Sequence, residues 1–62
     1  MHLKYKKQEK VYYRYSESIH TILRIDPTDF YKPYEISDGY SRIHWVSELD
    51  IKSIREVKLS IL

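Results

Sequence analysis

Histidines are the residues of this sequence whose type could bind a metal ion, together with its carboxylates. His2, His20 and His44 show no close spacing such as His-x-x-x-His, and zinc sites need three or four convergent ligands. His20 and His44 fall on the polar faces of two expected strands, where Glu35 or Glu48 could join them. The pattern is more typical of ordinary surface histidines, so we expect neither a metal site nor a cofactor.

Nucleophilic catalysis would need an activated serine with a base and an orienting acid within hydrogen-bond reach. Ser37, Ser41 and Ser47 stand instead where turns and helix caps are expected. The chain has no cysteine and one glycine, so it offers neither a thiolate nor a glycine-rich loop to hold a phosphate. These features predict that the protein is not an enzyme.

A basic, tyrosine-rich segment opens the chain. Its cations are Lys4, Lys6, Lys7, Lys10 and Arg14, and they interleave with Tyr5, Tyr12, Tyr13 and Tyr15. Cations that contact phosphates and rings that stack on bases are the combination that small β-barrels use for single strands. However, the net charge is only +2, and nine carboxylates dilute the field. Binding of single-stranded nucleic acid through this segment is therefore the alternative function.

Aromatic residues spread over the whole chain favour protein binding. There are seven tyrosines and one tryptophan, and such side chains are frequent hot spots of protein interfaces. The candidate protein-binding residues are Tyr12, Tyr13, Tyr31, Tyr40 and Trp45. Trp45 also fits a plain core position, whereas Tyr31 and Tyr40 stand in expected loops and are harder to bury. We therefore expect a module that binds a protein partner.

Length and composition place these residues in one domain over residues 1–62, with a basic, mobile arm over 1–10 and a β-barrel core over 11–62. A chain this short buries only ~60% of its unfolded surface, so formation of a homodimer would supplement its core. The absence of cysteine fits a reducing compartment. No apolar run of ~20 residues and no secretory signal is present, which predicts a cytoplasmic protein without membrane contact.

Alternating β-branched and aromatic residues predict strands over 11–15, 19–25 and 31–37. The second strand has Ile19, Thr21, Leu23 and Ile25 on one face, and His20, Ile22 and Arg24 on the other. Pro33 should place the start of the third strand at a sheet edge. Ser47 followed by Asp50 resembles a capping box, which predicts a helical turn over 47–50.

Asp38-Gly39 is the strongest local signal, because a type I′ hairpin turn needs φ > 0 at both of its central residues. A turn on these two residues places Ser37 opposite Tyr40. One face of the hairpin then carries Tyr34, Ile36, Ile43 and Trp45. The other face carries an ion pair between Glu35 and Arg42.

Residues 51–62 fit two structures. Val57, Leu59 and Ile61 alternate as in a strand, whereas Ile54, Val57 and Ile61 have helical spacing. The many β-branched residues favour a fifth strand.

The order of segments matches a known architecture. The segments are Ile22-Leu23-Arg24-Ile25, Tyr34-Glu35-Ile36, Ser37-Asp38-Gly39, Ile43-His44-Trp45-Val46 and Ser47-Glu48-Leu49-Asp50-Ile51. The stretch from Ile19 to Ile54 thereby resembles SH3-like small barrels of the Tudor and KOW type, including small proteins encoded by bacteriophages and prophages of low-GC bacteria.

This resemblance implies an all-β fold, either an SH3-like barrel or a curled five-stranded antiparallel sheet. It also implies an accessory protein that binds and modulates or inhibits a host protein. The glycine that is usual near the first loop of such barrels is missing, since Gly39 is the only glycine. A distorted barrel and an open sheet completed by dimerisation therefore both stay open.

Overall fold

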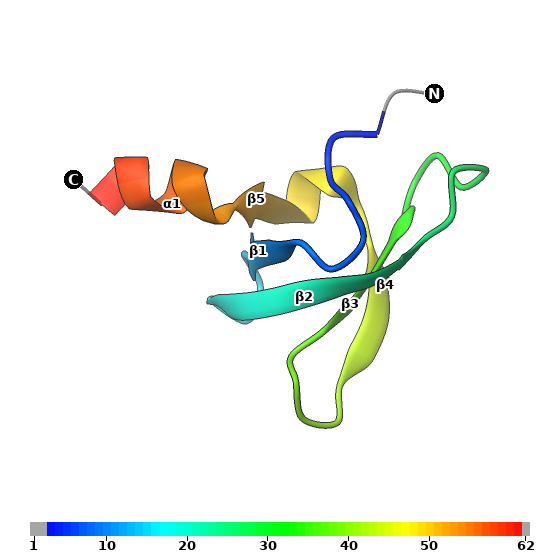
Figure 1. Ribbon diagram of the computed structural model, residues 1–62, viewed down its shortest axis with the longest axis horizontal. Helices are drawn as coiled ribbons and strands as arrows, with labels where there is room; N and C mark the ends of the chain where they lie inside the picture. The colour runs from blue at the N-terminus through cyan, green and yellow to red at the C-terminus, as the bar shows by residue number, and fades with distance from the viewer. Residues whose placement is uncertain (1–2, 62) are drawn as a thin grey trace.

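Five antiparallel strands form one sheet in the computed structural model, which describes residues 3–61 and their side chains up to Val57. The strands are β1 (Lys10–Tyr13), β2 (Ser18–Ile25), β3 (Tyr34–Ser37), β4 (Ile43–Val46) and β5 (Ile51–Ser53), in the sheet order β4-β3-β2-β1-β5 (Figure 1). A 3₁₀ turn, η1 (Glu48–Asp50), precedes β5, and the helix α1 (Ile54–Ile61) follows it. The predicted mainly β class is confirmed.

The capping-box pattern at Ser47 forms the predicted helical turn. Ser47 Oγ accepts a hydrogen bond from the Leu49 N–H at 3.2 Å, and Asp50 Oδ2 accepts one from the Ser47 N–H at 3.3 Å. The two side chains therefore satisfy backbone donors that the start of a helical turn leaves unpaired. This local signal is confirmed.

One face of the sheet forms the core. The buried apolar residues, none more than 3% exposed, are Tyr5, Val11, Ile22, Tyr34, Ile36, Val46 and Ile51. The prediction that His20 lies on a polar face is wrong, because β2 turns His20 and Ile22 inward and leaves Ile19 49% exposed. Both faces of β2 carry apolar residues, so alternation alone could not identify the inner one.

A register shift in β2 lets that strand contribute twice to the core. Ile22 pairs with Ile36, but the next pairs are Arg24 with Glu35 and Ile25 with Tyr34. The irregularity between Ile22 and Arg24 has the effect of a β-bulge, which changes the alternation of side chains along a strand. Ile25 consequently packs against the core although simple alternation would point it away from Ile22.

The predicted register of the β3–β4 hairpin is wrong. Ser37 pairs with Ile43 rather than with Tyr40, so the partner lies three residues further along the chain. Because an odd shift exchanges the two faces of a strand, His44 and Val46 point inward, and Ile43 and Trp45 point outward.

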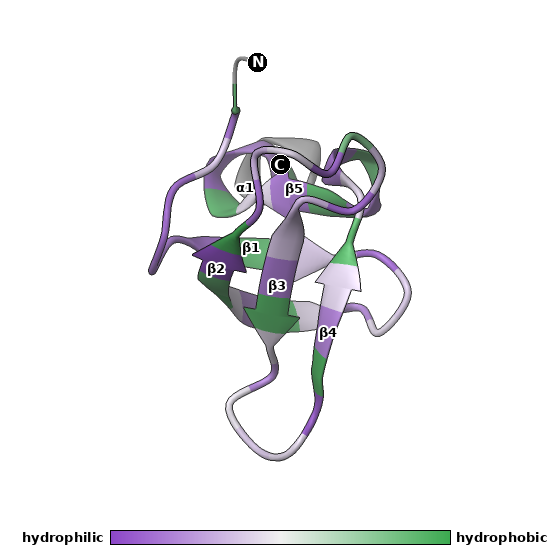
Figure 2. Ribbon diagram, turned by 90° about the vertical axis from the view of Figure 1, so that its right-hand side faces the viewer, coloured by the Kyte–Doolittle hydropathy of each residue, from purple (hydrophilic) through white to green (hydrophobic). Residues whose placement is uncertain are grey.

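The side chain of Asp38 explains the longer loop. Its Oδ1 accepts hydrogen bonds from the N–H groups of Tyr40 at 2.8 Å and Arg42 at 3.3 Å. Gly39 has a φ of 87°, as expected in a turn, but Asp38 is not among the residues with positive φ that a type I′ turn requires. The resulting loop over 38–42 extends away from the sheet at the bottom of Figures 1 and 2.

The C-terminal segment is a short strand followed by a helix, so the expectation of a fifth strand over 51–62 holds only for Ile51–Ser53. Ser53 Oγ accepts a hydrogen bond from the Glu56 N–H at 3.2 Å and thereby caps the first turn of α1. Ser53-x-x-Glu56 is the sequence pattern of a capping box. This signal outweighs the β-branched composition of the segment.

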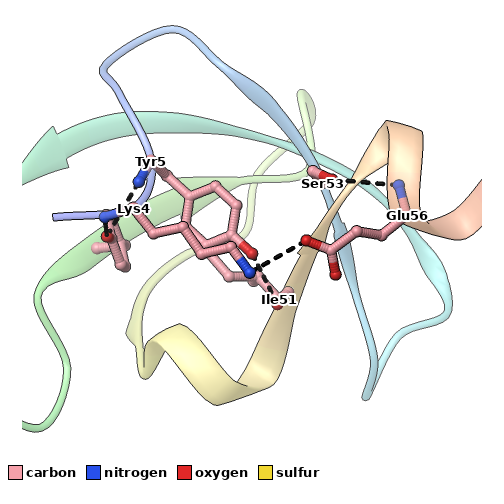
Figure 3. Close-up of polar contacts among 6 residues, drawn as sticks. Lys4, Tyr5, Ile51, Ser53 and Glu56 are labelled. Carbon is pink, nitrogen blue, oxygen red and sulfur yellow. Dashed lines mark hydrogen bonds and ion pairs between the residues drawn. The ribbon is translucent and has the colours of Figure 1, made fainter.

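The N-terminal segment packs onto the sheet through Tyr5. The ring of Tyr5 is 3% exposed and lies edge-on to Tyr34, with 5.4 Å between ring centroids. Tyr5 Oη donates a hydrogen bond to the Ile51 carbonyl at 3.3 Å, and Lys4 Nζ lies 3.0 Å from Glu56 Oε1 (Figure 3). The Tyr34 hydroxyl accepts hydrogen bonds from the N–H groups of Lys4 and Tyr5, both at 3.2 Å.

Candidate functional site

The sheet is curled strongly enough to bring its first and fourth strands together on the inner side. Tyr13 of β1 and His44 of β4 have ring centroids 5.0 Å apart, although β2 and β3 lie between them in the sheet. His20 of β2 completes the group, 5.2 Å from Tyr13 and 6.1 Å from His44. The curl therefore gathers three rings from three strands at one end of the inner face.

These rings border a cleft of about 400 Å³, which we call the aromatic cleft. Its lining residues are Tyr13, Tyr15, Ser16, Ser18, His20, Asp38, Arg42 and His44. They come from the end of β1, the turn into β2, the inner face of β2 and β4, and the loop over 38–42. The aromatic cleft is thus lined by aromatic rings, hydroxyls, a carboxylate and a guanidinium.

His20 has a defined orientation within the aromatic cleft. It is 3% exposed, and its Nδ1 lies 3.3 Å from the Ser18 carbonyl oxygen. Nδ1 also lies 3.5 Å from the Ser18 hydroxyl, so Ser18 holds this edge of the ring in either tautomer. Nε2 has no hydrogen-bond partner among the described residues, and His20 lines the aromatic cleft, so a ligand there can bind Nε2.

The carboxylate of Asp38 keeps its negative charge at the mouth of the aromatic cleft. The hydrogen bond from the Tyr40 N–H holds the pKa of Asp38 below its ordinary value, and the Arg42 N–H and the nearby His20 act in the same direction. Burial raises the pKa of the Tyr13 hydroxyl above 10.0, so this hydroxyl stays neutral. The cleft therefore presents a fixed carboxylate beside the Arg42 cation.

The predicted meeting of His20 and His44 is found, but their neighbours are Tyr13 and Asp38 rather than Glu35 or Glu48. Among residues 3–61 as described, no group of three or more histidine, aspartate and glutamate side chains could hold a metal ion.

The outer face of β4 is a second candidate surface. β4 ends the sheet, and its outward side chains Ile43 and Trp45 are 56% and 39% exposed. Glu35, which pairs in register with Trp45, lies 3.6 Å from Arg24 rather than beside Arg42. Trp45 is therefore not a core residue, and Ile43 joins it as a binding candidate that the predicted register had assigned to the core.

The five predicted protein-binding residues occupy three places. Tyr12 and Trp45 lie on the outer face of the sheet, Tyr13 lines the aromatic cleft, and Tyr31 and Tyr40 stand in loops with 83% and 94% exposure. The structure therefore does not unite them in one surface.

The five predicted nucleic-acid-binding cations are exposed but point to different partners. Lys4 pairs with Glu56, and Lys10 Nζ lies 2.7 Å from Thr21 Oγ1 on the outer face. The guanidinium of Arg14 lies over the Tyr15 ring, 5.3 Å from its centroid. Lys6 and Lys7 lie in the turn before β1.

A second hollow of about 380 Å³ lies near η1 and contains residues that sequence analysis did not single out. Phe30 and Leu49 line it and are 79% and 82% exposed. Only the tertiary arrangement of the loop over 26–33 beside η1 reveals this pair, because no sequence motif links Phe30 to Leu49.

None of the helices in the described part of the chain has the length and apolar character needed to cross a membrane. Comparison of the chain with protein-family models, with curated proteins and with solved structures gave no match.

Proposed function

We propose that the protein is a non-enzymatic module that binds an extended segment of a partner protein along β4. The observation that carries this proposal is an edge strand whose outer face exposes Ile43 and Trp45. Such an edge presents N–H and C=O groups that an added strand can pair with.

The composition of β4 supports an edge that accepts a partner. Proteins usually protect edge strands from unwanted pairing with lysine, proline or inward-pointing charges. The sequence of β4 is Ile-His-Trp-Val, which contains none of these. Apolar side chains of the added strand would pack on Ile43 and Trp45 in alternation, while the backbone pairing supplies orientation.

The biological role that we propose is that of a phage-type accessory protein, which binds a cytoplasmic host protein and blocks its working surface. Support comes from the small size of the chain and from the resemblance of its segment order to SH3-like barrels. Its mechanism is occlusion by a rigid sheet that uses Trp45 as the central contact.

The test is capture of partners from a host lysate by the wild-type protein, by Trp45→Ala and by Phe30→Ala. Phe30 is a matched control because it is an exposed aromatic residue that belongs neither to β4 nor to the predicted protein-binding residues. We expect the Trp45 variant to lose its partner and the Phe30 variant to retain it. Circular dichroism must show that both variants are folded.

Hydrogen exchange on the captured complex then locates the contact. Pairing with β4 should slow exchange of amides within 43–46, whereas undiminished capture by Trp45→Ala would contradict the proposal. Light scattering, which measures the oligomeric state, distinguishes a host partner from a second copy of the chain. If the chain dimerises through Trp45 and captures no other protein, the added strand comes from a second copy rather than from a host protein.

Binding of single-stranded nucleic acid through the basic segment is the alternative proposal. Its support is the exposure of all five cations, of which Lys6 and Lys7 make no side-chain ion pair among the described residues. Charge reversal at Lys4, Lys6 and Lys7 should abolish a steeply salt-dependent affinity for an oligonucleotide. Affinity that survives reversal, or that ignores salt, would exclude this function.

A further inference from the structure

We propose that the aromatic cleft binds a nucleotide, with the planar base among the rings of Tyr13, Tyr15 and His44 and the phosphate beside Arg42. The site uses neither the outer face of β4 nor the N-terminal lysines. It therefore goes beyond the proposed function, and either can fail without the other.

The first argument is the chemistry of the walls. Tyr13 lies at the centre of a ring cluster, 5.6 Å from Tyr15 and 5.0 Å from His44 between centroids. Tyr15 is 68% exposed, which is high for a large aromatic residue that has neighbouring rings to pack against. Exposed rings grouped in this way are the usual stacking platform for nucleobases.

The second argument is the pattern of hydrogen-bonding groups on the cleft. The Asp38 carboxylate is an acceptor and Arg42 is a donor, while His20 and the hydroxyls of Ser16 and Ser18 can take either role. The edges of nucleobases present N–H donors next to oxygen and nitrogen acceptors, and proteins read unpaired bases on these edges. A purely apolar ring would leave the polar groups of this cleft without partners.

The third argument is charge. Among the residues that line the aromatic cleft, Arg42 carries the guanidinium and Asp38 the carboxylate. The Arg14 guanidinium lies over the ring of Tyr15, which itself lines the cleft, so it adds a second positive charge close to the cleft. A guanidinium is well suited to binding a phosphate through two parallel hydrogen bonds. The same cations oppose a methylated ammonium ligand, which aromatic walls alone could otherwise accept.

The fourth argument is volume. The cleft measures about 400 Å³, within the range of small-ligand sites, and it is open enough for a base to enter from solvent or from a strand. A free nucleotide and one residue of a single strand share the chemistry that these walls recognise, so the experiment includes both sources.

The experiment is a titration of ¹⁵N-labelled protein followed by NMR, with AMP and UMP as free nucleotides and oligo(dT) as the strand. Adenosine and uridine, which lack the phosphate, are the matched ligands. We expect amide shifts confined to the lining of the aromatic cleft and weaker binding of the nucleosides than of the nucleotides. Saturation by AMP or UMP identifies the free form, and saturation by oligo(dT) alone identifies a strand.

Variants assign the contacts. Tyr15→Ala should weaken binding about tenfold through loss of stacking, whereas Tyr31→Ala, also an exposed tyrosine, should leave it unchanged. Arg42→Gln should remove the preference for nucleotide over nucleoside, whereas Arg24→Gln on the outer face should keep it. All four side chains are exposed, so these variants should fold.

Three results would overturn the proposal. One is the absence of any shift at millimolar concentrations of every probe. Another is a set of shifts centred on the N-terminal lysines. The third is an equal loss of affinity in the Tyr15 and Tyr31 variants. Saturable binding of a tyrosine-containing peptide in the cleft, with no nucleotide binding, would assign the rings to a protein ligand instead.

Discussion

The two ends of the curled sheet are built from similar aromatic side chains, but they differ in how far these side chains are accessible to solvent. At the end where β3 begins, Tyr5 fills the space itself, packing edge-on to Tyr34 and bonding to the Ile51 carbonyl. At the end where β3 finishes, Tyr13, His20 and His44 border a cleft of about 400 Å³. At one end, which we call the closed end, the ring of Tyr5 is buried in the core, and at the other, the open end, the rings line an open cleft.

This difference indicates that one end of this small domain mainly supplies stability and the other end mainly supplies a surface for binding. The closed end satisfies its polar atoms internally, because the Tyr34 hydroxyl accepts two backbone N–H groups. The open end keeps polar atoms and rings accessible. Substitutions at the closed end should therefore change the free energy of unfolding, while equivalent substitutions at the open end should change binding.

Tyr5→Ala should have the largest effect, because removal of a large buried aromatic side chain costs about 3–5 kcal/mol. A domain of 62 residues has a free energy of unfolding of roughly 3–9 kcal/mol, so this variant should lose about a third of that free energy or more. Tyr15→Ala at the open end should cost less than ~0.5 kcal/mol. Urea unfolding of the two variants measures the contrast, and equal losses would show that the ends do not differ as described.

Removal of one hydroxyl gives the next largest effect. Tyr34→Phe leaves the Lys4 and Tyr5 N–H groups without their acceptor, which should cost about 1–3 kcal/mol. Tyr13→Phe is the matched change at the open end, where the hydroxyl has no hydrogen-bond partner among the described residues, and it should be nearly neutral. Midpoints of thermal unfolding report both values. A neutral Tyr34→Phe would mean that the hydroxyl does not anchor the N-terminal segment.

The smallest effect distinguishes how each end holds a carboxylate. The pKa of Glu56 is lowered from 4.5 mainly by its hydrogen bond with the Lys4 ammonium, and that of Asp38 from 3.8 mainly by the Tyr40 N–H. Both lowered pKa values stabilise the fold above the ordinary pKa, and this contribution is lost as the pH falls through the folded-state values.

Salt should separate the two carboxylates. It screens the exposed Lys4–Glu56 pair, so the pKa of Glu56 should rise toward 4.5 at high ionic strength, whereas that of Asp38 should change less. Titration of the ¹³C carboxyl resonances at two salt concentrations measures this. Equal movement of both pKa values would indicate that charge, rather than backbone hydrogen bonding, controls Asp38.

Local signals predicted most of the elements. The capping box at Ser47 depends on side chains that bond within three residues, and it formed. β1 and β2 also lie close to their predicted ranges. The prediction for the third strand is wrong at its start, because β3 begins at Tyr34 and lies inside the sheet between β4 and β2, and β5 is limited to Ile51–Ser53. What sequence patterns could not supply was the choice between two local structures that the same residues permit.

The hairpin shows why one such choice affects the candidate site. Asp38-Gly39 fits a two-residue turn, but the Asp38 carboxylate stabilises a longer loop by binding two N–H groups. The three-residue change of register moves Ile43 and Trp45 outward and brings His44 beside Tyr13. The aromatic cleft depends on this register together with the curl of the sheet, and no pattern in the sequence encodes either directly.

The hydrogen bond between Tyr5 and Ile51 joins residues 46 positions apart, and it has a kinetic consequence. β1 lies between β2 and β5, so its second neighbour is absent until Ile51–Ser53 has been synthesised. Pairing between such distant segments costs the entropy of closing a long loop, and this cost precedes the stabilisation by the contacts that the pairing forms. We therefore expect a nascent chain ending before β5 to stay unfolded on the ribosome.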